Sequence, residues 1–207
     1  MTRLMTLFSA LLLAFVAFAQ TPEEIFARME AEIDKHEKDG VVMTVDVRIP
    51  LLGTMSSKVY SLDDKMRVEA KMMGVQIITW ADGVTEWIYN SKTDEVEIKK
   101  VDPKDNDPEG DVGMFEGLTD DYDITLKKET ADAWFFVCKK SKRNTDEDAP
   151  KTIDLAIAKG TYYPVSLKAT VSGVTMTLRD IAFGVTAKQV TFNPKDYPTA
   201  KIVDKRK

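Results

Sequence analysis

Val41-Val42-Met43-Thr44-Val45-Asp46-Val47-Arg48-Ile49 is the stretch that indicates the fold most directly. From residue 41 onward every second residue is apolar, and the residues between them at 44, 46 and 48 are Thr, Asp and Arg. Successive side chains of a β-strand point to opposite faces of a sheet, so this alternation is typical of a strand with one buried face. The segment therefore predicts a β-strand that packs on one side only.

The same alternation recurs along most of the remaining chain. Strands are predicted at 55–62, 66–72, 75–80, 84–89, 95–101, 122–128, 133–140, 152–157, 165–171, 174–181 and 189–192. Short turns such as Asp82-Gly83 and Ser172-Gly173 separate many of them, and such short connections join antiparallel neighbours. Because twist accumulates across a large sheet, about eleven strands do not stay flat. The sequence predicts a mainly β fold with some α-helix, in which a single large antiparallel sheet curls into an unclosed barrel.

A helix is predicted before the first strand. Thr21-Pro22-Glu23-Glu24 has the pattern of an N-cap, a first-turn proline and a capping-box glutamate. The apolar residues that follow at helical spacing are Ile25, Phe26, Met29 and Ile33, and Lys38-Asp39-Gly40 is expected to end the helix. A shorter helical turn is predicted at 114–118. We expect the N-terminal helix and this short lid helix to cover the sheet.

The first nineteen residues have the pattern of a cleavable signal peptide. Arg3 precedes the apolar run Leu4–Phe18, and Ala17-Phe18-Ala19 is a small-x-small cleavage site. A run of about fifteen apolar residues is shorter than the roughly twenty that span a bilayer. The next residue is Gln20, whereas a bacterial lipoprotein needs Cys at this junction. The sequence predicts a signal peptide at 1–19, one domain at 20–207, and a periplasmic protein without a lipid anchor.

Composition excludes several classes of function. The 207 residues contain 29 Lys and Arg against 34 Asp and Glu, a formal charge of −5, which disfavours a nucleic-acid partner. The single cysteine excludes an internal disulfide framework and Cys-based zinc clusters.

Histidine and cysteine, two residues that often perform catalysis, occur once each. His36 is the only histidine, and its place near the predicted helix end favours a solvated cap residue. Cys138 alternates with Trp134 and Phe136, which indicates a buried, inert thiol. There is no Gly-x-Ser-x-Gly motif and no glycine-rich phosphate loop. We therefore expect no enzymatic activity and no cofactor, and an enzyme acting on lipid is the weakest alternative.

The acidic segment at 105–116 partly matches a calcium-binding loop. Asp105, Asp107, Glu109 and Glu116 follow the spacing of oxygen ligands in a twelve-residue loop. Pro108 restricts the backbone where such loops turn, and a strand is predicted where an EF-hand has a helix. A plain acidic loop is the favoured interpretation, with calcium binding as the alternative, and we expect no metal site.

Four motifs in order along the chain resemble one family. Trp80-Ala81-Asp82-Gly83-Val84-Thr85-Glu86-Trp87-Ile88-Tyr89-Asn90 is similar to a characteristic hairpin of the periplasmic outer-membrane lipoprotein carriers, the LolA-like family. The predicted N-terminal helix, the run at 65–69, and the closing runs at 190–194 and 203–206 also resemble it. The resemblance covers essentially all of residues 20–207.

The resemblance implies a periplasmic carrier. Proteins of this family resemble an unclosed barrel whose helices cover a hydrophobic face that takes the acyl chains of lipoproteins. It implies transport from the inner to the outer membrane, with acylated lipoproteins, an inner-membrane release complex and an outer-membrane acceptor as partners, and a monomeric protein. The alternative is a lipid-binding periplasmic sensor domain of an envelope-stress regulator.

The resemblance implies that lipid binds to the apolar faces which the alternating strands and the amphipathic helix provide. The predicted lipid-binding residues are Phe26, Met29, Ile33, Met43, Val45, Val47, Met66, Val68, Ala70, Ile77, Ile88, Met114 and Phe115. Two features depart from the family pattern. Ser61-Leu62-Asp63-Asp64-Lys65 lacks the Arg-Pro pair whose arginine holds the lid, so no latch residue is assigned. Met66 and Val68 stand where the family has Phe and Trp, which predicts a wider, less aromatic cavity.

Overall fold

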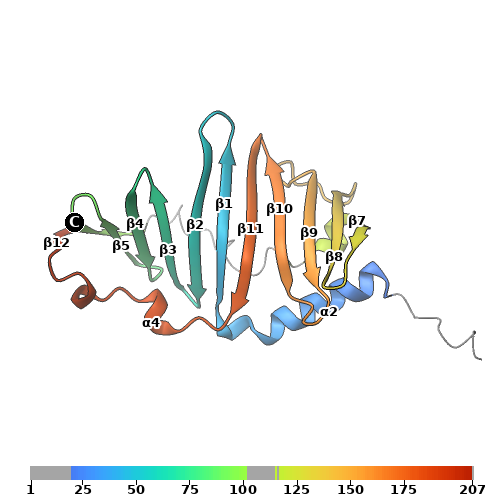
Figure 1. Ribbon diagram of the computed structural model, residues 1–207, viewed down its shortest axis with the longest axis horizontal. Coiled ribbons are helices and arrows are strands. Elements are labelled where there is room, and N and C mark those ends of the chain that lie inside the picture. Colours follow the sequence, from blue (N-terminus) through green and yellow to red (C-terminus); the bar gives the residue numbers. More distant parts are fainter. Residues whose placement is uncertain (1–19, 102–114, 116, 207) are drawn as a thin grey trace, which may run out of the picture.

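The computed structural model describes residues 20–101, 115 and 117–206, and these form one open β-sheet with helices on its surfaces (Figure 1). The strands are β1 (Val41–Ile49), β2 (Gly53–Leu62), β3 (Lys65–Met72), β4 (Val75–Ala81), β5 (Thr85–Asn90), β6 (Glu95–Lys100), β7 (Tyr122–Glu129), β8 (Ala133–Lys140), β9 (Thr152–Ala158), β10 (Pro164–Val171), β11 (Val174–Phe183) and β12 (Lys201–Asp204). The helices are α2 (Pro22–Lys35), η1 (Glu37–Asp39), α3 (Leu118–Asp121), α4 (Ala187–Val190) and η4 (Pro194–Asp196).

The twelve strands lie in the order β12-β6-β5-β4-β3-β2-β1-β11-β10-β9-β8-β7. Strand β1 pairs antiparallel with β11 at the centre, and β12 and β7 lie at opposite ends of the sheet (Figure 1). The predicted single, unclosed sheet is confirmed. The last strand is the exception to the antiparallel pattern, because β12 pairs parallel with β6. That pairing joins segments far apart in sequence, which local alternation does not predict.

The strand predicted at 189–192 is wrong. Residues 187–190 form the short helix α4, with a capping box between Thr186 and Gln189. The apolar run is too short for its period to distinguish a helix from a strand. Tertiary packing determines the structure here, because the Phe192 ring packs on Trp80 and Trp87 of the sheet and its segment does not pair as a strand.

Helix α2 forms as predicted and covers one end of the sheet. Thr21 and Glu24 form the capping box, and Lys35 ends the helix. The residues that face the sheet are fully buried: Ile25, Phe26, Met29 and Ile33. The Phe26 ring meets Phe136 of β8 edge-on, with 5.0 Å between the centroids. The main core lies between α2 and the strands from β1 through β11 to β7, and we call this side of the sheet the α2 face.

The C-terminal segment packs on the other side, which we call the back face. Trp80 of β4 and Trp87 of β5 are paired neighbours, and both contact Phe192, at centroid distances of 5.3 and 5.8 Å. Arg67 of β3 lies over the Trp80 ring and donates a hydrogen bond to the Gln189 carbonyl at 3.4 Å. The hairpin and the closing run that carried the family resemblance therefore contact each other, and they anchor the C-terminal segment.

His36 lies at the end of α2 as predicted, but its side chain is only partly exposed to solvent. It caps the C-terminus of α2, but both ring nitrogens have partners: Nδ1 lies 2.6 Å from a carboxylate oxygen of Asp39 and Nε2 lies 2.5 Å from the Tyr163 hydroxyl. The ring also stacks on Phe183. These partners lie more than a hundred residues away along the chain, apart from Asp39, so local sequence did not reveal them.

Candidate functional site

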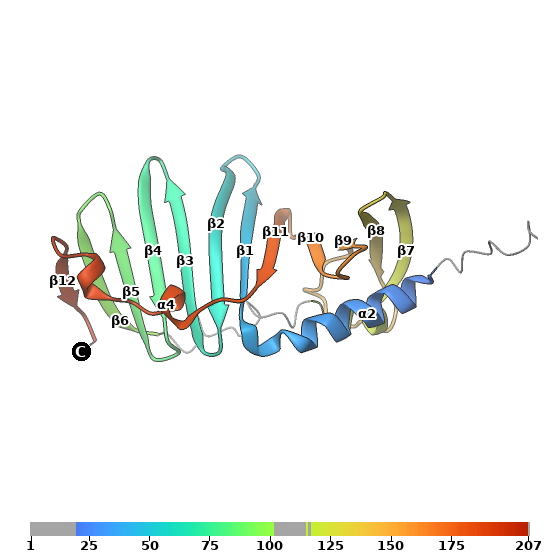
Figure 2. The ribbon, with the colours of Figure 1, turned by 60° about the horizontal axis from the view of Figure 1, so that its bottom comes forward.

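The α2 face is larger than the helix that covers it. At 1.5 Å per residue the fourteen residues of α2 are about 21 Å long, whereas twelve strands at 4.8 Å spacing extend about 53 Å. Figure 2 shows α2 beside the β7 to β11 half of the sheet, and α4 beside β3. Because α4 packs on the back face, no helix among the described residues covers the α2 face over β2 to β5.

Register shows that this uncovered part is one apolar surface. Val45 of β1 lies opposite Ser57 of β2, which lies opposite Ala70 of β3, which lies opposite Ile77 of β4. A second row runs from Met43 through Val59, Val68 and Thr79 to Ile88. We call the surface the open stretch. Its apolar members, of which Val45 and Val59 also pack against the α2 core, are Val45, Val47, Met55, Val59, Met66, Val68, Ala70, Met72, Val75, Ile77, Ile88 and Met176.

The open stretch remains accessible in the folded protein. Met55, Met66, Met72 and Met176 are exposed, and the valines and isoleucines between them are only partly buried. Methionine has three rotatable bonds and a polarizable sulfur, so these side chains can adapt to an apolar surface of varied shape. An apolar patch of several strands left in contact with water is typical of a binding surface.

Charged residues mark the end of the open stretch. On the same face, Glu86 of β5 forms an ion pair with Lys99 of β6 at 2.9 Å. Beyond it Glu97 pairs with Lys205 at 2.7 Å and Glu95 with Lys201 at 3.6 Å. The apolar surface therefore ends at β5 and has a defined width, from β11 to β5.

The predicted lipid-binding residues fall into two groups. Phe26, Met29, Ile33, Met43 and Phe115 are buried in the core beneath and beside α2. Val45, Val47, Met66, Val68, Ala70, Ile77 and Ile88 belong to the open stretch on the same face. Met114 lies outside the described residues. The other residues of the acidic segment at 105–116, apart from Phe115, also lie outside them, and so does the signal segment at 1–19.

Sequence reasoning missed several members of the open stretch. Met55, Met72 and Met176 continue it toward the ends of the strands, where Val47 lies opposite both Met55 and Met176. The signal that could have found them is the alternation itself, because these residues have the same parity as their apolar neighbours along each strand.

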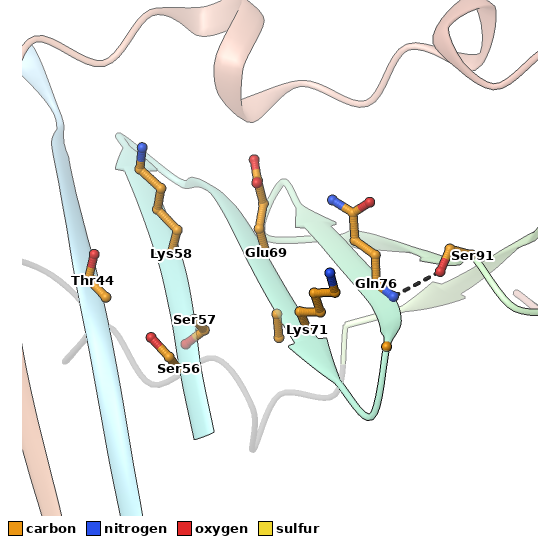
Figure 3. A pocket seen from close by; sticks show the side chains of 10 residues that line it. Thr44, Ser56, Ser57, Lys58, Glu69, Lys71, Gln76 and Ser91 are labelled. Atoms are coloured by element: carbon orange, nitrogen blue, oxygen red, sulfur yellow. Dashed lines mark hydrogen bonds between the residues drawn. The ribbon is translucent and has the colours of Figure 1, made fainter. Parts of the chain in front are cut away.

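A depression with a volume of about 570 Å³ lies elsewhere, mostly on the back face. Its lining is polar and includes Lys58, Glu69, Lys71 and Gln76. Figure 3 shows the side chains of Lys58, Glu69 and Gln76 pointing the same way, and the backbone N–H of Gln76 donates to Ser91 Oγ at 2.8 Å. This depression does not overlap the apolar members of the open stretch except at Ala70, and its polar walls do not suit an acyl chain.

The space beneath α2 is filled by the protein's own side chains. Phe26 and Met29 have no exposed surface, and Phe136 and Ile157 below them are equally buried. An apolar ligand would have to displace α2 to reach this region, whereas the described residues leave the open stretch partly exposed.

Metal-binding side chains do not cluster in the described part of the chain. It holds no cluster of three or more His, Cys, Asp or Glu side chains that could bind a metal ion. Within the same ranges, no helix has the length and apolar character needed to cross a membrane.

The Cys138 thiol is fully buried in β8 and is expected to be unreactive in the folded protein. Burial, together with the negative charge of Asp154, raises the pKa of the thiol to about 12. At pH 8 the thiolate fraction is then about 10⁻⁴, and the thiolate is the species that reacts. We expect a thiol reagent such as dithionitrobenzoate to label the native protein negligibly within an hour and completely in denaturant. Rapid labelling without denaturant would contradict the buried position.

Comparison with known proteins bears on the fold. No family model and no curated protein matches the sequence. Among solved structures, lipoprotein LppX from Mycobacterium tuberculosis matches with a TM-score of 0.53 at 10% identity, over 81% of this chain and 98% of that chain. LprF from Mycobacterium bovis matches with a TM-score of 0.51 at 11% identity, over 84% and 98%. A LolA superfamily protein from Nitrosomonas europaea also matches, at 12% identity over 86% and 100%, with a lower TM-score of 0.33.

The fold is LolA-like. At these identities the likeness concerns the course of the backbone and not the chemistry of particular side chains. It agrees with the fold that the family resemblance implied, a single open sheet. What the LolA-like fold of this chain binds is inferred below from its own residues.

Proposed function

We propose that the protein is a periplasmic carrier, not an enzyme, that binds the acyl chains of lipoproteins on the open stretch and moves them from the inner to the outer membrane. The observation that supports it is the apolar surface from β11 to β5, which the fold leaves uncovered by α2. Residues 1–19 act as the cleaved signal peptide in this proposal. An inner-membrane release complex supplies the cargo and an outer-membrane acceptor receives it.

The energetics suit reversible transport. Full burial of a CH₂ group contributes about 0.8 kcal/mol, so a sixteen-carbon chain gains about 12 kcal/mol at most. A chain lying on a sheet surface is buried on one side, which reduces the gain to about half. That is enough to hold the chain during passage through water, and small enough for an acceptor to remove it.

In this proposal the two groups of predicted residues have different roles. Val45, Val47, Val68, Ile77 and Ile88 contact the acyl chain. The side chains beneath α2 hold that helix in place and become part of the binding surface only when α2 leaves the sheet. The open stretch is therefore the first binding surface that a cargo meets.

Adjacent residues of β4 provide a matched test. Ile77 belongs to the open stretch, whereas its neighbour Gln76 points to the back face opposite Lys71. We expect Ile77→Glu to weaken binding of a diacylated lipopeptide at least tenfold, about 1.4 kcal/mol, because the carboxylate must lose water when an acyl chain covers it. Gln76→Glu adds the same charge and should leave affinity unchanged. Val68→Glu repeats the test on β3.

The measurement is displacement of an apolar fluorescent dye by the lipopeptide. Far-UV circular dichroism and the melting temperature show whether each variant folds. If folded Ile77→Glu and Val68→Glu proteins bind the lipopeptide as tightly as the unmodified protein, the open stretch is not the binding surface.

The proteins recovered with this one from periplasm distinguish a carrier from a sensor. Many different acylated proteins would support the carrier. Recovery of one membrane-anchored regulator and no acylated cargo would contradict it and favour the sensor domain of an envelope-stress regulator.

A further inference from the structure

Three hairpin turns at one edge of the sheet expose large apolar side chains. They are the β1–β2 turn at 50–53, the β3–β4 turn at 72–75 and the β10–β11 turn at 171–174. Leu51 is 106% exposed, Met73 99% and Leu52 82%. We call the exposed apolar residues of these hairpins the apolar rim: Leu51, Leu52, Met55, Met72, Met73, Val171, Val174 and Met176.

The three turns lie on the same edge. In Figure 1 the β1–β2 and β10–β11 turns are at the top of the sheet, with the β3–β4 turn beside them, and α2 and α4 are at the bottom. A Cβ atom added at Gly173 would lie 3.9 Å from Pro50 Cγ, so the β10–β11 and β1–β2 turns are direct neighbours. The apolar rim is therefore one surface assembled from distant parts of the sequence.

Folding does not explain the residues at the tips. Leu51 and Met73 have positive φ angles of 68° and 50°, a conformation that large side chains rarely adopt. Asp63 and Asp94 occupy such conformations in two other turns of this sheet, as turn preferences favour. Leucine and methionine at these places add backbone strain without burying any apolar surface. Such residues are typical of an interaction surface.

The charges next to the rim are mainly positive although the protein is acidic. The first charged residues before the three turns along the chain are Arg48, Lys71 and Lys168. The first ones after the turns lie at least five residues away: Lys58, Asp82 near the opposite edge, and Arg179, which forms an ion pair with Asp46. The nearest charge before each turn is therefore basic in a chain with a net charge of −5. This bias fits an anionic surface.

The rim is also amphipathic across the thickness of the sheet. Met55, Met72, Val174 and Met176 lie on the α2 face, whereas register places Arg48, Lys71 and Lys168 on the back face. Lys71 is two residues from Met73 and Arg48 three from Leu51, about 7 and 10 Å along extended chain. Amphipathic elements bury their apolar side about 5–10 Å into the boundary between headgroups and acyl chains. At that depth the basic groups reach the phosphates.

We propose that the apolar rim docks the protein on a lipid bilayer that contains anionic headgroups, with the tips of the three hairpins inserted. The spacing of apolar tips and basic groups fits the layered structure of a bilayer. Docking does not depend on the proposed function, because a protein can attach to a bilayer without carrying lipid.

Docking would place the open stretch next to the membrane. Val47 lies opposite Met55 and Met176, so the rim continues without interruption into the open stretch. An acyl chain could then pass between bilayer and protein without crossing water.

The test uses protein purified from periplasm, with removal of residues 1–19 established by mass spectrometry. Flotation with vesicles of phosphatidylcholine and phosphatidylglycerol at 3:1 is compared with phosphatidylcholine alone. We expect binding to the anionic vesicles, weakened at least tenfold in the double variant Leu51→Ser/Met73→Ser. In Arg48→Gln/Lys71→Gln we expect the preference for anionic vesicles to be lost. The Leu51 and Met73 side chains are fully exposed, so the double variant should fold normally.

Val84 provides the control. It is 72% exposed, in the β4–β5 turn at the opposite edge of the sheet, and Val84→Ser should bind vesicles like the unmodified protein. Equal binding by the rim variant, or no binding by the unmodified protein, would overturn the proposal. A dimer that dissociates in the rim variant, without vesicle binding, would also overturn it and assign the rim to a second copy. Lipopeptide affinity of the rim variant reports separately on the open stretch.

Discussion

Replacing Phe26 by alanine is expected to lower the free energy of unfolding by about 3–5 kcal/mol. The Phe26 ring has no exposed surface and meets Phe136 edge-on, so its removal leaves a cavity between α2 and the sheet. Met29 of α2 and Leu155 of β9 belong to the same close-packed core, so it cannot collapse fully into the cavity. The measurement is urea denaturation followed by circular dichroism.

Asp34→Ala is the control for Phe26→Ala. Asp34 lies on the exposed side of α2 in its last turns, so its replacement should change the free energy of unfolding by less than about 0.5 kcal/mol. A loss smaller than 1 kcal/mol in Phe26→Ala would show that the region beneath α2 is not the tightly filled core described above.

Gly40→Ala is expected to destabilise the protein by about 2–4 kcal/mol. Gly40 joins η1 to β1 with φ 66° and ψ 166°, a conformation almost confined to glycine, which costs other residues about 1–3 kcal/mol. A Cβ atom there would lie 2.5 Å from the Ser61 carbonyl oxygen and 3.0 Å from Val185 Cβ. The backbone of β2 would have to shift, which adds to the cost. Thermal denaturation measures the effect.

Gly160→Ala is the matched glycine control. Gly160 lies in the β9–β10 turn, and nothing lies within 4 Å of the position its Cβ atom would take. Alanine there should be neutral or stabilise the protein by up to about 1 kcal/mol, because it restricts the unfolded chain. If the two alanine variants unfold at the same temperature, the contact between a Cβ atom at position 40 and the Ser61 carbonyl oxygen does not affect stability.

The strands and the first helix could be predicted because their signals are local. Alternation between 41 and 49 assigns side chains to faces, and the Thr21–Glu24 capping box fixes where α2 begins. The same alternation explains why the predicted lipid-binding residues within the described part all lie on one side of the sheet. Local signals failed for residues 189–192 and for β12, where long-range packing determines the structure.

The division of the candidate site was not predictable from local signals. Met43 and Val45 are two residues apart on the same face of β1, yet Met43 is buried in the core and Val45 is only partly buried at the start of the open stretch. His36 shows the same limit, because its partner Tyr163 comes from the distant β9–β10 connection. Sequence periodicity predicts the face of the sheet on which a side chain lies. It does not predict whether another element packs on that side chain.

The sequence alone determined that this protein is an open, mainly antiparallel sheet with one apolar face and an N-terminal amphipathic helix, because propensity, capping and period act between near neighbours in the chain. Only the tertiary structure decided which apolar residues of the α2 face are buried in the core and which remain exposed. A fourteen-residue helix is too short to cover twelve strands, and the C-terminal segment packs on the back face. The open stretch results from that mismatch in size, which exists only after the sheet is assembled.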